Sequence, residues 1–337
     1  MHEMIKPRAL KPGDTIKIIA PSSTLGNVEG LSNAIDFIKK HGFKVSLSTN
    51  LTHATPQRFS TTGDRIRKTE LENAFKNDDI DAIIALRGGA GSIDLLDIID
   101  YDIIREHPKI FVGYSDITLL QLAFLKKANL ITFQGPMLID LTEGDSQVLN
   151  QNWSTLLSII SAGDALELKN PIGSKWSKTI TEGRGRGMLL GGNMTMLSLI
   201  SNTQYMPSTE GSVMFLEDVD LAPWMVDNIF TSLIIKGAMN GITGLVFGEF
   251  PHYGFEEALK NSSAAAFLFN DLFVEDYVDS TIKDIIIDIL IKKLQNIPSF
   301  VDFACCHGKY ITTIPMGAMV EIDAKEQKLS MLESAVS

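Results

Sequence analysis

The first 140 residues alternate apolar, strand-like runs with amphipathic helical stretches, and this alternation restricts the possible folds more than any other feature of the chain. The strand-like runs are TIKIIA, FKVSLS, DAIIAL and KIFVG. Helical spacing appears in LSNAIDFIKK, in DRIRKTELENAFKN, where Asp64 is the expected N-cap, and in SIDLLDIIDYDIIREH. Strands separated by helices pair in parallel, with helices on both faces of the sheet. The predicted class is α/β, with a Rossmann-like or flavodoxin-like parallel sheet in the N-terminal domain.

The second half of the chain has a different pattern. Shorter strand-like runs, SVMFLEDV, ITGLVFGEF, ITTIPMGAMVEID and KLSMLE, are interspersed with helical stretches such as PWMVDNIFTSLIIKGA. A length of 337 residues exceeds what one core usually organises. We therefore predict an N-terminal α/β domain at 1–150, a linker at 151–185, and a mixed, β-rich C-terminal α/β domain at 186–337.

Charge and cysteine content exclude several classes of protein. The net charge of −11 disfavours nucleic acid or an anionic membrane surface as a partner. The two cysteines, Cys305 and Cys306, are adjacent, so they supply neither a disulfide framework nor a CxxC metal motif. The chain has no signal-peptide pattern and no uncharged apolar run of about 18 residues. These features predict a cytoplasmic protein with no nucleic-acid or membrane partner.

The segment GYSDIT at 113–118 joins a buried strand directly to a helix. In open parallel sheets, reactive groups gather at the carboxyl ends of strands, where helix N-termini offer backbone N–H groups. Ser115 at such a corner has the placement of a nucleophile elbow, although the segment is not G-x-S-x-G. The alternative is that Ser115 simply caps the helix.

A serine nucleophile needs a base and an acid that orients it. Of the six histidines, His307 follows a strand-like run and precedes a glycine, as a loop residue held by flanking strands would. The other five lie at the N-terminus, at expected helix C-termini or in polar loops: His2, His41, His53, His107 and His252. Glu217 closes the apolar strand VMFL, where a carboxylate needs a specific partner. The alternatives are a solvated loop histidine and a surface or helix-capping acid.

The segment RGGAGS at 87–92 also follows a buried strand. Its glycines do not satisfy G-x-G-x-x-G, so a phosphate cradle is only weakly indicated. As an oxyanion loop it would bring the backbone N–H of Gly89 close to a reacting carbonyl. Arg87 could meet a substrate carboxylate or merely cap the sheet edge.

Together these segments resemble the LD-carboxypeptidase family of serine peptidases, which includes the microcin C immunity peptidases. The resemblance runs nearly end to end, through KPGDTIKIIAPSS, DAIIALRGGAGS, KIFVGYSDITLL, GMLLGGNMTMLSLI, VMFLEDV, GLVFGEF and HGKYITTIPMGAMVEID. It implies that Ser115 is the nucleophile, Glu217 the acid and His307 the base, in a cleft between the two domains. It also implies an oxyanion hole formed by the N–H groups of Gly89 and Asp116.

The resemblance further implies a homodimer that uses no metal or organic cofactor, and a substrate that is a murein peptide or a peptide or aminoacyl nucleotide. Several positions depart from the family pattern: Ala90 replaces an aromatic residue, Gln134 a histidine and Cys306 a glycine. The segment IPSFVDF resembles the microcin-immunity branch, whose aromatic loop residue faces the nucleotide, and Trp176 is the candidate for that role. The rival function is a non-catalytic module that binds a small ligand in the same cleft.

Overall fold

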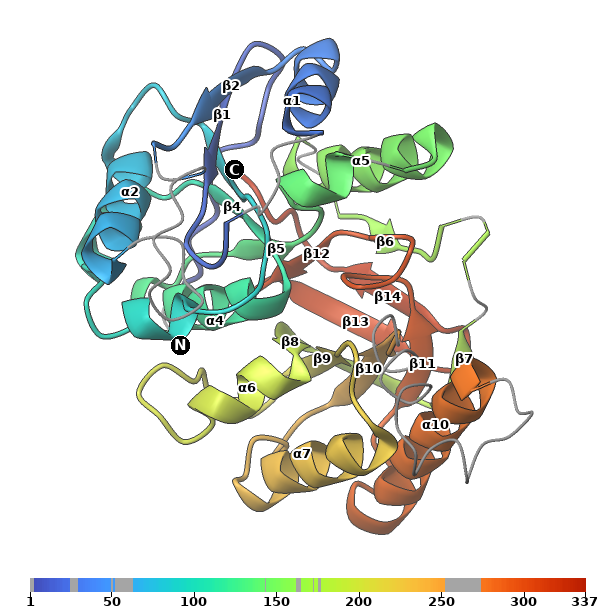
Figure 1. Ribbon diagram of the computed structural model, residues 1–337. Coiled ribbons are helices and arrows are strands. Elements are labelled where there is room, and N and C mark those ends of the chain that lie inside the picture. The colour runs from blue at the N-terminus through green and yellow to red at the C-terminus, as the bar shows by residue number, and fades with distance from the viewer. Residues whose placement is uncertain are drawn as a thin grey trace, which may run out of the picture.

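The computed structural model describes residues 3–24, 30–49, 51, 63–142, 144–161, 165–171, 173–174, 177–251 and 274–337. These residues form two β-sheets with helices packed around them (Figure 1). Among the described residues, no helix is both long enough and apolar enough to cross a membrane.

The first sheet has the strand order β12-β5-β4-β3-β1-β2, and all neighbours are parallel except the antiparallel pair β12–β5. Its strands are β1 (Thr15–Ile19), β2 (Lys44–Leu47), β3 (Ala82–Ala85), β4 (Ile110–Gly113), β5 (Thr132–Gln134) and β12 (Ile314–Met316). The order 2-1-3-4-5 is that of flavodoxin-like folds, with the topological switch point between β1 and β3. The crevice expected to bind ligands therefore lies beyond the carboxyl ends of β1 and β3.

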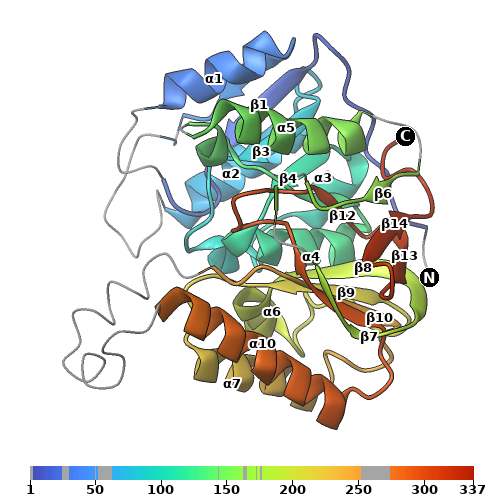
Figure 2. The ribbon, with the colours of Figure 1, turned by 90° about the vertical axis from the view of Figure 1, so that its right-hand side faces the viewer.

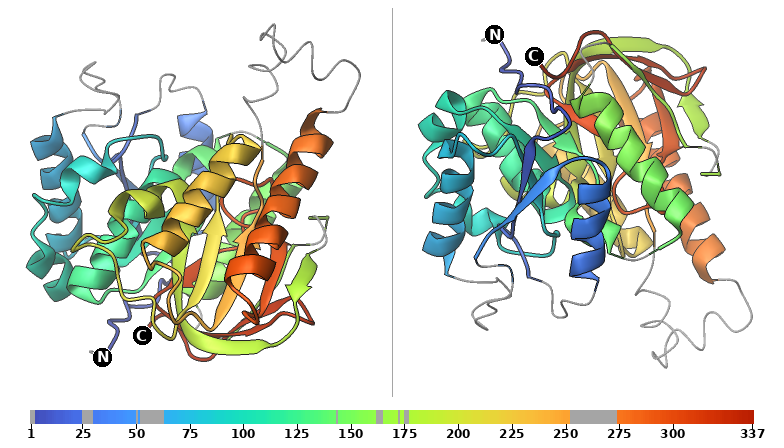
Figure 3. Two further views of the ribbon diagram at one scale, coloured as in Figure 1. Left: turned by 90° about the horizontal axis from the view of Figure 1, so that it is seen from below. Right: turned by 90° about the horizontal axis from the view of Figure 1, so that it is seen from above.

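Helices cover both faces of the first sheet. Figure 3 shows α1 (Leu31–Lys40) and α5 (Ser146–Ile160) on one face, with α2 (Asp64–Lys76), α3 (Tyr101–Glu106) and α4 (Thr118–Ala128) on the other. Strands β3 and β4 are buried along their whole length, because a parallel sheet with helices on both faces leaves neither face to water.

The second sheet has the order β6-β14-β13-β8-β9-β10-β11-β7. Its strands are β6 (Glu167–Leu168), β7 (Lys178–Thr181), β8 (Arg184–Asn193), β9 (Val213–Glu217), β10 (Gly244–Gly248), β11 (Ser299–Phe303), β13 (Met319–Asp323) and β14 (Lys328–Met331). The four central strands from β8 to β11 are parallel, and the flanking strands are antiparallel. Figure 2 shows α6 (Met194–Ile200), α7 (Pro223–Ile235) and α10 (Val274–Lys293) on one side of this sheet. The predicted α/β class with a mixed, β-rich second part is confirmed.

The chain crosses between the two sheets more than once. Strand β12 lies in the range predicted for the second domain, yet it pairs with β5 of the first sheet through Pro315 and Phe133. At the C-terminus, Ser337 exchanges backbone hydrogen bonds with Pro7 and Ala9. The boundaries 1–150 and 186–337 therefore stay a prediction.

Two local expectations were wrong. The helix expected over SIDLLDIIDYDIIREH is broken into a 3₁₀ turn, η1 (Ser92–Leu95), and α3, because Asp100 accepts a hydrogen bond from the Asp102 N–H and starts a new helix. Asp64 is the first residue of α2 rather than its N-cap, which is Gly63. The Asp64 carboxylate instead binds the buried guanidinium of Arg67 at 2.7 Å.

Candidate active site

Ser115 lies at a tight corner between β4 and the 3₁₀ turn η2 (Ser115–Ile117), which leads into α4. Its φ of 64° is in the left-handed region, a conformation that costs a non-glycine residue about 1 kcal/mol. Tyr114 occupies the N-cap position of η2, and no side chain caps the turn. The capping alternative for Ser115 is therefore wrong, and the strained corner is the geometry that presents a side chain outward.

The RGGAGS loop packs directly against this corner. A Cβ on Gly88 would lie 2.7 Å from the Ser115 Cβ. Gly89 has a φ of 122°, and a side chain there would meet the Cβ of Ser23 at 2.6 Å. The Ala90 N–H donates to the Ser23 hydroxyl at 3.1 Å. The loops after β1, β3 and β4 thus meet beside the topological switch point.

The Asp116 side chain joins these three loops. Its Oδ2 accepts a hydrogen bond from the Ser22 hydroxyl at 2.6 Å and from the Ser92 N–H at 2.9 Å, and the residue is only 3% exposed. The sequence had indicated only the backbone N–H of Asp116, as part of an oxyanion hole. The buried Asp116 carboxylate thus fixes two loops relative to Ser115: the loop after β1 that contains Ser22, and the RGGAGS loop after β3 that contains Ser92.

Glu217 and His307 are brought together by the second sheet. Glu217 is the fully buried last residue of β9, and its Oε2 lies 2.6 Å from Nδ1 of His307. Burial by itself lowers the pKa of His307, but the charge and hydrogen bond of Glu217, together with Asp218 and Asp140, raise it above the ordinary value. Because Glu217 engages Nδ1, Nε2 is the ring nitrogen that would exchange a proton with a substrate or nucleophile.

Asn193, at the end of β8, was not among the expected site residues. Its amide lies 3.4 Å from Oε1 of Glu217 and donates to the Asp218 carboxylate at 3.0 Å. Asp218 also accepts from the N–H and hydroxyl of Thr195 at 2.8 and 2.7 Å. The motif GGNMT could have indicated Asn193, because its polar amide closes a strand that lies next to the strand ending in Glu217.

Tyr114 connects the two sheets at this point. Its ring packs nearly perpendicular to the imidazole of His307, with the ring centroids 5.0 Å apart. Because Tyr114 precedes Ser115 in the chain, this contact brings the Ser115 corner to the side of the molecule that carries His307. The phenol hydroxyl donates to Asp140 Oδ1 at 2.9 Å, and burial of the Asp140 carboxylate raises its pKa to about 6. Nothing in the segment MLID had indicated Asp140.

Two departures from the family pattern contact each other. Gln134 is fully buried at the end of β5, and its Oε1 accepts from the Cys306 thiol at 3.4 Å. Cys306 has a φ of 65°, a backbone conformation that suits the glycine usual in the family. The adjacent Cys305 and Cys306 sulfurs are 2.8 Å apart, and burial raises the pKa of both thiols. The two substitutions thus form one buried contact directly beneath the His307 loop.

The remaining expectations concern substrate binding. Arg87 follows β3, and its Nε is buried without a hydrogen-bond partner among the described residues. Trp176, His2, His53 and His252 lie outside the described residues. A pocket of about 370 Å³ adjoins the site and is lined by Asp140, Asn152, Gly308 and Lys309, among others. In the described ranges, no group of three His, Cys, Asp or Glu side chains could hold a metal ion.

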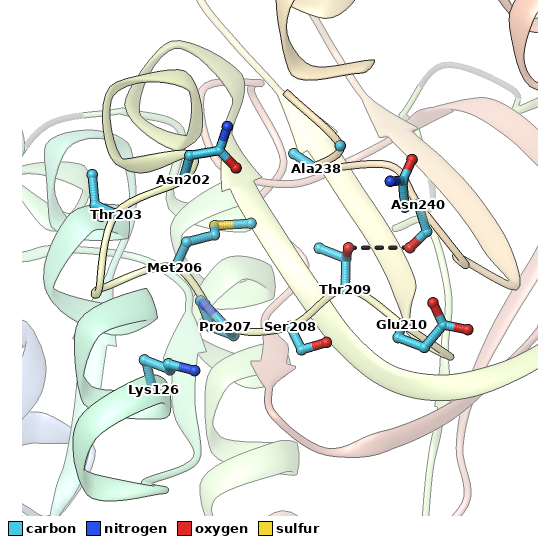
Figure 4. Close-up of a pocket in the computed structure, with 11 residues that line it drawn as sticks. Lys126, Asn202, Thr203, Met206, Pro207, Ser208, Thr209, Glu210, Ala238 and Asn240 are labelled. Atoms are coloured by element: carbon cyan, nitrogen blue, oxygen red, sulfur yellow. Dashed lines mark hydrogen bonds between the residues drawn. The ribbon is translucent and has the colours of Figure 1, made fainter. Parts of the chain in front are cut away.

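A second pocket, of about 440 Å³, lies elsewhere (Figure 4). Its lining includes Lys126, Asn202, Glu210 and Asn240, and the Thr209 hydroxyl donates to the Asn240 carbonyl at 3.2 Å. The segments around Glu210 and Asn240 precede β9 and β10, so this pocket is at the amino ends of those strands. It contains none of the expected site residues.

Comparison with known proteins agrees with this geometry. The family described as LD-carboxypeptidase N-terminal domain matches residues 16–135, and the LD-carboxypeptidase C-terminal domain matches 186–322. A probable murein peptide carboxypeptidase of Bacillus subtilis is 28% identical, over 98% of this chain and 95% of its own. The microcin C7 self-immunity protein MccF of Escherichia coli is 25% identical, over 97% and 96%. The crystal structure of an MccF-like protein from Bacillus anthracis is 27% identical, with a TM-score of 0.83, covering 97% of this chain and 99% of its own.

Proposed function

This chain belongs to the LD-carboxypeptidase family of serine peptidases, and from that premise we propose that Ser115, Glu217 and His307 form its catalytic triad. The observation that carries the proposal is the Glu217–His307 pair at 2.6 Å, in which Glu217 is fully buried and the His307 ring packs against Tyr114, the residue before Ser115. A carboxylate that orients an imidazole beside a strained serine corner is the arrangement that activates a hydroxyl.

In the proposed mechanism, Nε2 of His307 takes the Ser115 proton as Oγ attacks the carbonyl carbon. Glu217 keeps the imidazole oriented through Nδ1 and stabilises the imidazolium that forms. The backbone N–H groups of Gly89 and Asp116 bind the developing oxyanion. His307 then protonates the leaving amine, and water attacks the resulting ester to release the product and restore Ser115.

We assign as substrate a small peptide or peptide nucleotide that is cut at an amide bond near its free carboxyl end. The relatives named murein peptide carboxypeptidase and microcin self-immunity protein support two substrate classes, murein tetrapeptides and aminoacyl or peptidyl nucleotides. Parallel assays with a muropeptide and with an acidic aminoacyl sulfamoyl adenosine distinguish them. Arg87 and Trp176 stay candidate contacts for the substrate carboxylate and the nucleotide.

The test of the triad is Ser115→Ala. We expect a folded protein whose turnover falls by about 10³-fold or more, with no labelling by a fluorophosphonate, which acylates activated serines. Wild-type hydrolysis by this variant would refute the triad. A wild-type protein inert to the fluorophosphonate but stabilised by ligand would instead indicate the binding module.

We also propose that the protein acts in the cytoplasm as a homodimer. Support for a self-association surface comes from large apolar side chains exposed on the helices of the second sheet, with Trp224 65% and Ile235 80% exposed on α7. Light scattering coupled to size exclusion measures the assembly. A monomeric mass at micromolar concentration would contradict the dimer.

A further inference from the structure

Asp140 and Tyr114 form a hydrogen-bonded brace beside His307, in which Tyr114 is buried and Asp140 half-buried. Tyr114 is 6% exposed and donates its hydroxyl to Oδ1 of Asp140 at 2.9 Å. The other carboxylate oxygen accepts the Met137 N–H at 2.8 Å. The turn that carries Asp140, η3 (Leu138–Leu141), is tied to the end of β3 by the Ile139 N–H, which donates to the Leu86 carbonyl at 3.0 Å. Asp140 is thus a fixed acceptor that determines where the Tyr114 ring lies.

The imidazole of His307 is held from two directions. The hydrogen bond to Glu217 fixes Nδ1 from the second sheet. The Tyr114 ring supplies a second contact from the first sheet, at 5.0 Å and an interplanar angle of 88°. Edge-to-face aromatic contacts of this kind contribute orientation as well as burial.

We propose that Asp140 is a positioning residue of the active site: through the Tyr114 hydroxyl it holds the phenol ring against His307 and so keeps the imidazole aligned with Ser115. This inference rests on the proposed triad. It assigns to the first sheet a share in orienting a base that the second sheet carries.

Charge adds a second effect of the same residue. Glu217, Asp218 and Asp140 each raise the pKa of the His307 imidazole. Tyr114 is also in contact with this ring, and burial holds the pKa of its phenol well above the ordinary value. The Glu249 carboxylate lies against Gly308, the residue after His307. Burial raises the pKa of Asp140 to about 6, so Asp140 gains its proton as the pH falls through that value. The acid limb of activity should therefore respond to both Asp140 and His307.

Two variants test the brace. Asp140→Asn removes the charge and replaces one of the two acceptor oxygens with an NH2 donor. The side chain can then no longer accept from both the Tyr114 hydroxyl and the Met137 N–H, so the hold on Tyr114 weakens. Tyr114→Phe keeps the ring and removes only the hydroxyl. Asp36→Asn, an exposed change of the same charge on α1, is the matched control. The readouts are the fluorophosphonate labelling rate of Ser115 against pH, and the pKa of His307 measured by NMR with isotopically labelled histidine.

We expect labelling by the Asp140→Asn protein to slow about tenfold, and its His307 pKa to fall by about half to one unit. Tyr114→Phe should slow labelling severalfold. The double variant should be no slower than Asp140→Asn alone, because both changes break one interaction. Asp36→Asn should match the wild type.

Unchanged labelling and an unchanged His307 pKa in folded Asp140→Asn would overturn the inference, as would effects of the two variants that simply add. If Asp140→Asn does not fold, Tyr114→Phe decides, and a wild-type labelling rate in that variant overturns the inference. The NMR titration does not require Ser115 to be the nucleophile. A failed triad would appear as no labelling of the wild type, while the His307 pKa would still report on the brace.

Discussion

The substitution Gly88→Ala tests the position of Ser115 without replacing any member of the proposed triad. The added Cβ would lie 2.7 Å from the Ser115 Cβ and 2.9 Å from its Oγ. Carbon atoms in ordinary contact are about 3.5–4.0 Å apart, so the serine must move by roughly 1 Å. Gly88 is not among the glycines with positive φ, so its backbone accepts alanine without strain. The effect of the substitution is therefore steric and directed at the nucleophile.

A displacement of about 1 Å at a reacting atom lowers the rate by about 100-fold, or about 2.7 kcal/mol in the activation free energy. We expect this loss in kcat and in the fluorophosphonate labelling rate, with the protein still folded by circular dichroism. Gly63→Ala is the control, because a Cβ there meets no atom within 4 Å and φ is −55°. Labelling and turnover of Gly88→Ala within threefold of wild type would refute the placement of the nucleophile at this corner.

Four further outcomes follow from the contacts of the structure. Glu217→Gln should lower the rate of hydrolysis by about 10³–10⁴-fold. It should also move the acid limb of the pH–rate profile to lower pH, because it removes the largest influence that raises the pKa of His307. An unshifted acid limb would contradict the Glu217–His307 pair. In the wild type, protonated His307 should stabilise the fold fully below pH 6.5, its ordinary pKa, and this stabilisation should be lost as the pH rises through the raised pKa of the folded state. Thermal unfolding of the wild type and of Glu217→Gln across this pH range measures the effect. Arg67→Met should reduce the free energy of unfolding by about 3–5 kcal/mol. The reason is that the fully buried guanidinium binds the Pro21 and Gly91 carbonyls at 2.5 and 2.8 Å. The control is Arg65→Met at an exposed position, and equal denaturation midpoints of the two variants would show that Arg67 is dispensable. Cys305 and Cys306 should react with a thiol reagent only after denaturation, because both are buried and burial raises the pKa of each thiol; rapid reaction of native protein would show that the loop opens.

Periodicity predicted four of the six strands of the first sheet, β1 to β4. Strands β3 and β4 are continuous apolar runs because both faces of the sheet are covered. The three-residue strand β5 was not predicted, and β12 was expected in the second domain. The placement of Ser115 and Glu217 at the carboxyl ends of β4 and β9 followed from where each apolar run stops. His41 and His107, expected at helix C-termini, are the C-caps of α1 and α3.

Long-range partners could not be predicted in the same way. Arg67 looks like one charge on an amphipathic helix, and only the loops at Pro21 and Gly91, folded over it, make it a buried brace. Asp140 reads as an ordinary loop acid until η3 carries it to Tyr114. The contact between Gln134 and Cys306 joins positions 172 residues apart, and no local pattern encodes that distance. Sequence periodicity reports which face of an element is buried, but not which side chain it meets there.

The pairing of β12 with β5 limits how this molecule can open. The proposed base, His307, is on the loop that leads into β12, and β12 pairs with the sheet that carries Ser115. Moving the two sheets apart would break the antiparallel pairing that sets Ile314 opposite Gln134 and Met316 opposite Thr132. Substrate entry should therefore depend on movement of loops around the site, while the β5–β12 pairing stays intact. A fragment that ends before β12 would leave β5 as an unpaired edge strand, which is prone to pair with other chains and aggregate.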